Sequence, residues 1–148
     1  MGFKVRGQYQ EKRRNMNLYK EFGTSTKKEL EGIKITPIEG IHFYCRRSGG
    51  ANKAYQEAST KRLRPYLQKF NSGKNIPLDI IQDINIENFC DWVLLGWENV
   101  TFRDGTPMEF TKDNAKKLLK ELPELYSALE SESSDVNSFK ENDDIPGK

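Results

Sequence analysis

The sequence predicts a mainly α-helical α+β fold with one small β-hairpin, between a mobile N-terminal arm and a disordered acidic C-terminal tail. Apolar and polar residues alternate over residues 32–47, which is the period of a β-strand. Over most of residues 52–130 the apolar residues instead recur every three or four positions, as on an amphipathic helix. Residues 1–31 are basic and residues 131–148 acidic, and both have too few apolar residues to order themselves. We therefore expect one domain, residues 32–130.

The bulk composition narrows the class of protein. A chain of 148 residues with 35% hydrophobic and 31% charged residues allows one modest core and argues against a second. Its net charge of +2 is too small to indicate nucleic-acid binding by itself. The longest apolar run, residues 92–95, is far shorter than the roughly 18 residues that span a bilayer. The basic start of the chain lacks an apolar signal segment, so we expect a cytoplasmic protein with no membrane partner.

The first half of the domain is predicted to form a hairpin and then two helical stretches. The apolar face of the hairpin is expected to comprise Ile33, Ile35, Ile41, Phe43 and Cys45. A helix is expected over residues 52–70, with a kink or break at Pro65. Residues 77–95 are expected to be the helical core segment, which Asn85 divides by capping a second helix and Gly96 ends.

The second half is predicted to contain a tight chain reversal and two short helices. Asp104-Gly105 lies in the middle of residues 100–110, which is typical of a tight turn. Thr111 is suited to cap the next helix, because its hydroxyl can accept a hydrogen bond from a free backbone N–H. Pro123 is suited to the first position of the last helix.

The residues that could support catalysis or metal binding form no recognisable constellation, so we expect no enzyme, cofactor or metal site. Phosphate-binding and nucleophile motifs are absent, and His42 is the only histidine. Cys45 and Cys90 lie beside Phe43 and Phe89, which favours buried free thiols over a disulfide or metal site. An acidic stripe at helical spacing favours the solvated side of a helix, with cation binding or acid–base chemistry as the alternative. It comprises Asp79, Asp83, Glu87 and Asp91.

A series of short motifs between residues 94 and 129 resembles the tail assembly chaperone family of long-tailed bacteriophages. The motifs are Gly96-Trp97 with Val100, Asp104-Gly105, Phe110-Thr111, Asn114-Ala115, and Leu122-Pro123 with Leu125. A weaker likeness extends back to about residue 32. The resemblance covers residues 32–130 and excludes the basic arm and the acidic tail.

The resemblance implies a function without catalysis. Such chaperones bind the tape-measure protein, keep it soluble, and promote polymerisation of the tail-tube protein around it before leaving the tail. In many relatives a frameshifted longer form recruits tail-tube subunits, and residues 146–148 could be encoded by a slippery run. We therefore expect a protein of the host cytoplasm that is not a component of the mature virion.

The expected partner-binding surface combines the last two helices with the aromatic reversal. It comprises Trp97, Phe102, Leu118, Leu122, Leu125, Tyr126 and Leu129. The alternative is that these residues all belong to the internal core. Three other functions stay open: a nucleic-acid-binding regulator that uses the basic arm and the basic face of residues 61–74, a phage connector or completion protein, and an enzyme that uses the acidic stripe.

Overall fold

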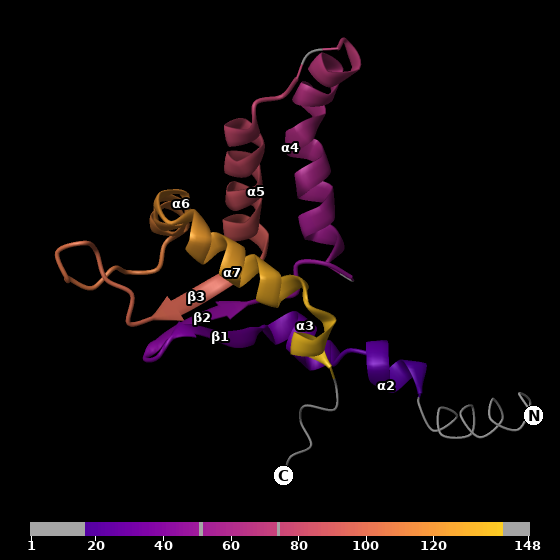
Figure 1. Cartoon of the computed structure of the whole chain (residues 1–148). Coiled ribbons are helices and arrows are strands. Elements are labelled where there is room, and N and C mark those ends of the chain that lie inside the picture. The colour runs from indigo at the N-terminus through magenta and orange to yellow at the C-terminus, as the bar shows by residue number, and fades with distance from the viewer. Residues whose placement is uncertain (1–16, 51, 74, 141–148) are drawn as a thin grey trace, which may run out of the picture.

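The computed structural model describes residues 17–50, 52–73 and 75–140, and it confirms an α+β fold with a three-stranded antiparallel sheet (Figure 1). In chain order the elements are α2 (Leu18–Phe22), α3 (Thr26–Glu31), β1 (Ile33–Ile38), β2 (Ile41–Cys45), α4 (Lys53–Asn71), α5 (Leu78–Trp92), β3 (Leu94–Glu98), α6 (Lys112–Glu121), α7 (Pro123–Ser134) and the 3₁₀ helix η1 (Val136–Phe139). The strand order in the sheet is β1-β2-β3.

The predicted hairpin is confirmed as β1 and β2. Ile35 pairs with Phe43, and the chain turns at Gly40, whose φ of 87° lies in the region that glycine adopts without strain. Ile35, Phe43 and Cys45 are buried, so the alternating pattern correctly identified the inward face.

The expectation that helix continues to Leu95 is wrong, because residues 94–98 form β3. This strand pairs with β2, so that Trp97 lies opposite Phe43 and Gly96 lies within the strand. Helix α5 ends at Trp92 and runs past Asn85 without a division. An apolar run as short as residues 92–95 fits a buried strand as well as a helix, and pairing with β2 decides between them.

The helices form two groups around the sheet. Figure 1 shows α4 and α5 as a hairpin that projects away from the sheet, while α7 crosses β1 and β2. Helix α4 continues through Pro65 without the break that the sequence predicted as one possibility. Helix α6 packs on α5, and Thr111 caps it by accepting a hydrogen bond from the Asn114 N–H at 3.0 Å, as predicted.

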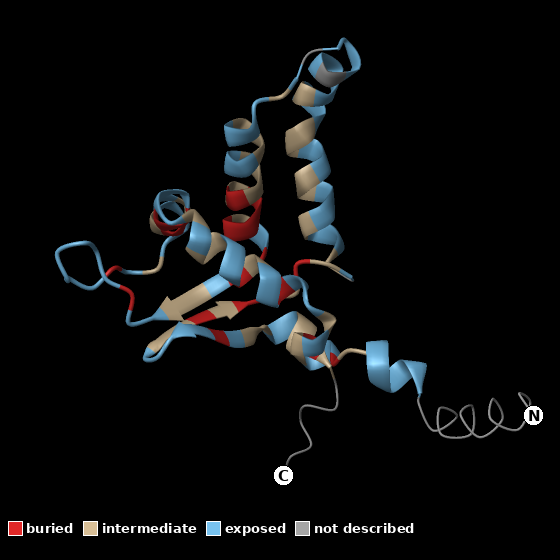
Figure 2. Cartoon of the chain, in the orientation of Figure 1, coloured by how far each residue is buried: buried red, intermediate tan, exposed pale blue. Residues whose placement is uncertain are grey.

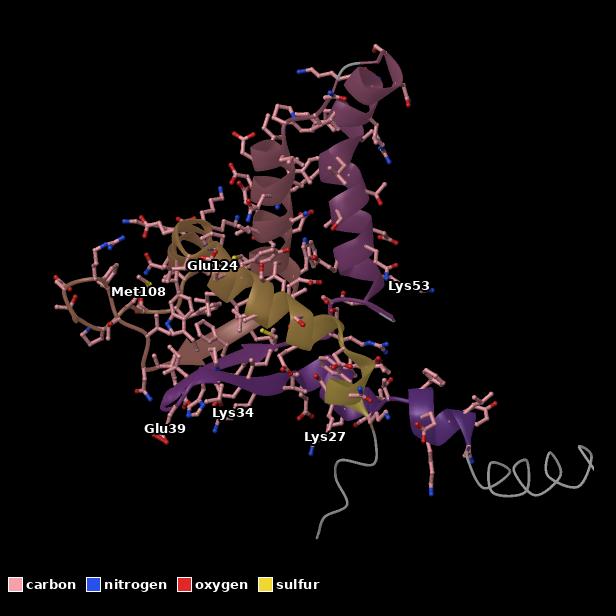
Figure 3. All side chains as sticks on the ribbon, in the orientation of Figure 1. Lys27, Lys34, Glu39, Lys53, Met108 and Glu124 are labelled. Carbon is pink, nitrogen blue, oxygen red and sulfur yellow. The ribbon has the colours of Figure 1, made fainter. Side chains whose placement is uncertain are left out.

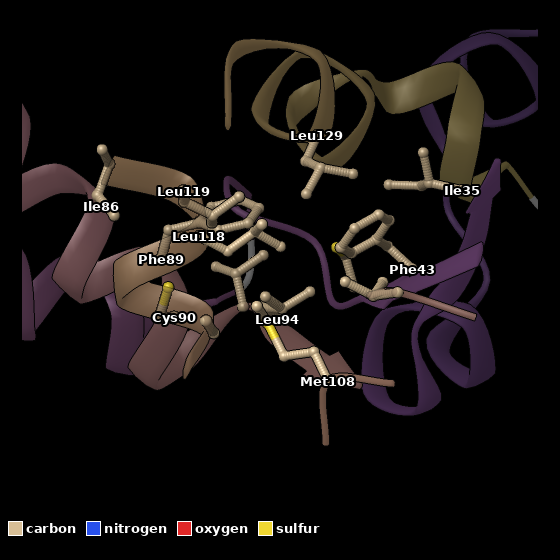
Figure 4. Close-up of a cluster of buried hydrophobic side chains, with 14 residues drawn as sticks. Ile35, Phe43, Ile86, Phe89, Cys90, Leu94, Met108, Leu118, Leu119 and Leu129 are labelled. Carbon is tan, nitrogen blue, oxygen red and sulfur yellow. The ribbon is translucent and has the colours of Figure 1, made fainter. Parts of the chain in front are cut away.

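The core lies where the sheet, the C-terminal half of α5, and helices α6 and α7 meet (Figures 2 and 4). Phe43, Phe89, Leu119 and Leu129 are almost completely buried there. The Phe89 ring meets that of Tyr126 edge-on, with the centroids 5.4 Å apart. Such edge-to-face pairs add to the stabilisation that burial of the rings provides.

The expected loss of order after Glu130 is wrong for residues 131–140. Helix α7 extends to Ser134, and the Phe139 side chain in η1 is 0% exposed. The Ser25 N–H donates to the Phe139 carbonyl at 2.7 Å, and the Ser48 N–H donates to that of Ser133 at 2.9 Å. These bonds come from distant parts of the chain, so local composition could not predict them. Residues 141–148 of the expected tail lie outside the described residues.

The expected N-terminal arm lies partly within the described residues and is partly attached to the domain. Residues 1–16 are outside them, while α2 and α3 follow as short capped helices. Glu29 forms an ion pair with Arg47 at 2.7 Å, and the Lys28 ammonium donates to the Lys140 carbonyl at 3.0 Å. These contacts join α3 to the domain and to the segment after α7.

Candidate functional site

An apolar groove of about 240 Å³ opens between the β1–β2 hairpin, the chain that follows β3, and the junction of α6 with α7. We call it the apolar groove. It is lined by Pro37, Ile38, Ile41, Phe43, Val100, Thr101, Leu118, Leu122 and Leu125. All of these side chains except that of Thr101 are apolar, so the groove offers a surface for another apolar group rather than a site for chemistry.

The groove has an exposed rim and a buried floor. Ile38 and Leu122 on the rim are 65% and 46% exposed, whereas Leu118 and Val100 on the floor are 8% exposed each. Apolar area on the rim stays in contact with water until a partner covers it, so its burial would favour binding.

A second hollow adjoins the apolar groove, and Leu118 and Leu122 line both. Phe102, which is 37% exposed, and Met108 contribute its other apolar surface. Charged side chains of both signs surround this hollow: Arg103, Asp104, Lys117 and Glu121. Leu122 therefore lies between two neighbouring hollows, a largely apolar one and one with a polar rim.

The local structure of β1 disfavours strand pairing at this site. β1 is an edge strand of the sheet, and its register with β2 shifts between Ile35 and Ile38. Pro37 lies at that shift and has no N–H to donate to an added strand. A partner would therefore bind the groove through side chains, as an amphipathic helix does.

The structure divides the seven predicted partner-binding residues into two sets. Phe102, Leu118, Leu122 and Leu125 line the two hollows, so four of the predicted residues lie together. Whether they bind a partner stays a prediction.

The other three predicted residues pack in the interior, in agreement with the alternative interpretation. The ring of Trp97 lies between those of Phe43 and Phe110, and its indole N–H donates to the Met108 carbonyl at 2.9 Å. Tyr126 packs on Phe89, and burial raises the pKa of its phenol; Leu129 is 0% exposed.

The sequence reasoning missed the β1 side of the groove. Ile38 is out of phase with Ile33 and Ile35, which is the pattern of an apolar side chain that leaves the buried face. That signal was present, but the approach of β1 to α6 and α7 depends on tertiary packing. Val100 was predicted only as part of the reversal, and it lines the groove floor.

Two of the four carboxylates of the acidic stripe join helices together. Asp91 pairs with Arg62 at 2.7 Å and Lys116 at 3.1 Å, and Glu87 pairs with Lys120 at 2.9 Å. Burial opposes the charge on Asp91, but the hydrogen bonds from Arg62 and Lys116 lower its pKa below the usual value. These carboxylates thus connect α4 and α6 to α5, and no cluster of His, Cys, Asp and Glu able to hold a metal ion occurs among the described residues.

The remaining side chains that could take part in a reaction are hydrogen-bonded or buried within the domain. His42 Nδ1 lies 2.8 Å from the Thr36 hydroxyl, on the exposed side of the hairpin. Cys45 and Cys90 are free and buried, as predicted, and burial raises the pKa of each thiol to about 12. Thiols of such high pKa are poor nucleophiles. Within the described part of the chain, no helix combines the length and apolar character that crossing a membrane requires.

Comparison with known proteins places the chain in a phage-associated family. A family model described as YdaY prophage protein matches residues 50–146, well over half of the chain. The chain belongs to the YdaY prophage protein family. No curated protein and no solved structure matches it. The YdaY match begins just before α4 and includes α6 and α7, so it covers the helical side of the apolar groove but not the β-hairpin side.

Proposed function

We propose that this YdaY-family protein is a phage tail assembly chaperone that binds an amphipathic helix of the tape-measure protein in the apolar groove. It keeps that partner soluble, promotes polymerisation of the tail-tube protein around it, and leaves before the tail is complete. The observation that carries the proposal is the open apolar rim formed by Ile38 and Leu122 on an otherwise well-packed core.

The two neighbouring hollows suit a helical partner. Side chains three or four residues apart lie on the same face of a helix, about 5–6 Å from each other. One such side chain would enter the apolar groove and the next would enter the hollow beside Phe102, with Leu122 between them. Lys117 and Glu121 at the second hollow would contact charged residues along the edges of the partner's apolar stripe.

The size of the groove supports reversible binding. Full burial of one apolar side chain contributes about 1.5–3 kcal/mol. The partly exposed Ile38, Leu122 and Phe102 would contribute only part of this each, and association itself costs at least about 4 kcal/mol. We therefore expect weak binding, with a dissociation constant above the micromolar range for a single groove, which suits a chaperone that must release its partner.

Co-expression with the longest predicted coiled-coil protein of the same prophage tests the proposal. We expect co-purification and a higher soluble fraction of that partner. Leu122→Glu and Ile38→Glu should each abolish both effects, because they place a charge on the apolar rim. Leu30→Glu is the matched control, since Leu30 is 66% exposed but lies on α3, outside the groove. Retention of the complex by both rim variants would contradict the proposal.

Two further measurements distinguish the other functions. Mass spectrometry of purified particles should find this protein nearly absent, whereas a connector or completion protein would remain in the virion. A nucleic-acid-binding regulator would form a complex in a gel-shift assay, and increasing salt would dissociate that complex. We expect this protein to form no such complex. The frameshifted longer form is tested by sequencing the gene across the codons for residues 146–148, which lie outside the described residues.

A further inference from the structure

The outer half of the α4–α5 hairpin, residues 61–84, has apolar side chains that its own fold leaves partly exposed. We call this segment the outer hairpin. None of the described side chains of α4 is buried, and α5 becomes buried only from Ile86 onward. The incompletely covered apolar residues are Leu63, Tyr66, Leu67, Ile76, Leu78, Ile80, Ile81 and Ile84. In Figures 2 and 3 the outer ends of these two helices stand clear of the other described elements.

The most exposed positions show that the outer hairpin lacks a covering layer. Leu67 is 44% exposed and Leu78 is 82% exposed, while α4 packs mainly on α5. Helices in stable domains bury an apolar stripe against other elements, and a pair of helices alone covers only part of each stripe. The outer hairpin therefore resembles half of a four-helix bundle.

The two helices of the hairpin carry opposite charges. Helix α4 has five basic side chains and one acidic, whereas α5 has four acidic side chains and no basic one. Lys61 and Arg64 on α4, and Asp79 and Asp83 on α5, form no ion pair with any residue in the described ranges. A surface with unused charges of both signs on adjacent helices is complementary to itself after a two-fold rotation.

We propose that the outer hairpin binds the same segment of a second copy of this chain, so that two hairpins form an antiparallel four-helix bundle. In this arrangement α4 of each copy packs against α5 of the other. The basic side chains of each α4 then face the acidic side chains of the partner's α5, and the exposed leucines lie between the helices. This inference does not rest on the proposed chaperone function, because the apolar groove is formed by other elements.

The available area indicates a reversible dimer. The part of α4 in the outer hairpin, residues 61–71, is about 16 Å long at about 1.5 Å per residue. Two helices with axes about 9 Å apart present a face about 18 Å wide, which gives about 300 Å² per copy. The total of about 600 Å² is below the range of stable specific interfaces, so a weak dimer with a dissociation constant well above the micromolar range is expected.

The same charge pattern disfavours a nucleic acid on this surface. The basic side chains of α4 lie beside the carboxylates of α5, which repel phosphates at short range. The basic side chains of α4 would attract a polyanion, but the carboxylates of α5 would repel it. A second copy, in contrast, satisfies both charges at once.

Sedimentation velocity across a concentration series that extends to the millimolar range tests the dimer. We expect the mass to rise from 17.2 kDa to twice that value. Leu67→Glu and Leu78→Glu should each weaken association at least about tenfold, while helical circular dichroism stays unchanged because both side chains are exposed. Leu122→Glu, in the apolar groove, is the matched control and should leave the dimer intact.

A charge-reversal experiment tests the proposed helix pairing directly. Lys61→Glu/Arg64→Glu should be monomeric, and so should Asp79→Lys/Asp83→Lys. An equimolar mixture of the two variants should form a heterodimer, because each reversed helix then meets a helix of opposite charge. A wild-type chain that stays monomeric throughout the series would overturn the proposal, as would a mixture that does not associate. A third result would also overturn it: a chain that is monomeric and loses tape-measure binding when the outer hairpin is mutated. That result would mean that the outer hairpin binds the tape-measure protein and not a second copy.

Discussion

Replacement of Phe139 by alanine tests whether the segment after α7 belongs to the fold. The Phe139 side chain is 0% exposed, and its carbonyl accepts a hydrogen bond from the Ser25 N–H. Phe→Ala at buried sites costs about 3–5 kcal/mol. Because η1 follows the last long helix, it can detach from the domain without unfolding the core. The substitution therefore cannot lower stability by more than the free energy with which η1 is attached. We therefore expect a loss of about 3 kcal/mol, the lower end of the range.

Urea denaturation followed by circular dichroism measures this loss. Asn137→Ala is the matched control, because Asn137 lies in the same 3₁₀ helix with an exposed side chain. It should change the free energy of unfolding by less than about 0.5 kcal/mol. Hydrogen exchange should also show that the Ser25 amide loses protection in Phe139→Ala, since its acceptor is the Phe139 carbonyl. A loss below about 1 kcal/mol with unchanged exchange would mean that the buried Phe139 contributes little, and it would refute this reasoning.

Three further predictions concern the caps, charges and thiols of the domain. Thr111→Ala should lower the free energy of unfolding by about 1 kcal/mol in urea titrations, and Thr111→Ser should largely restore it, because the hydroxyl caps α6. Since the pKa of Asp91 is lower in the folded chain, the unfolded state binds more protons in acid. The contribution of the Asp91 carboxylate to the free energy of unfolding should therefore be complete above the unfolded-state pKa of about 3.9 and should fall as the pH drops below that value. In acid titrations of unfolding, Asp91→Asn should make the free energy of unfolding depend less steeply on pH. Cys45 and Cys90 should react with a thiol reagent at pH 8 only as fast as the domain opens, because both thiols are buried and burial raises the pKa of each to about 12. Rapid reaction without denaturant would contradict this prediction.

The elements that the sequence predicted well depend on local chemistry. The β1–β2 hairpin follows from the alternation of Ile33 with Ile35 and of Ile41 with Phe43 and Cys45, and from the turn at Gly40. Helix α6 begins where Thr111 can cap it. The turn at Gly105 is confirmed by a hydrogen bond from its N–H to the Phe102 carbonyl at 2.9 Å. In each case, neighbouring residues alone decide the backbone conformation, so a single sequence contains the necessary information.

The elements that the sequence failed to predict depend on distant partners. Residues 94–98 are a strand because β2 lies beside them, and Phe139 is buried because Ser25 and its neighbours cover that end of the domain. The same reason explains the candidate site. Leu118, Leu122 and Leu125 were predicted as one surface, but the periodicity of a helix does not show which members of its apolar stripe the sheet will cover. The contribution of Ile38 required the tertiary fold.

The proposed roles of the apolar groove and the outer hairpin would together allow weak contacts to hold a long helical protein. A dimer through the outer hairpins would leave both grooves open, because each groove is formed by β1, β2, α6, α7 and the loop after β3. A partner with several amphipathic segments would then bind two grooves at once, and the second contact would gain from the high effective concentration that the first creates. Each contact would remain weak by itself, so tail-tube subunits could displace them one at a time. Strong retention and easy release, which a single large interface cannot combine, would follow from two modest surfaces on one small domain.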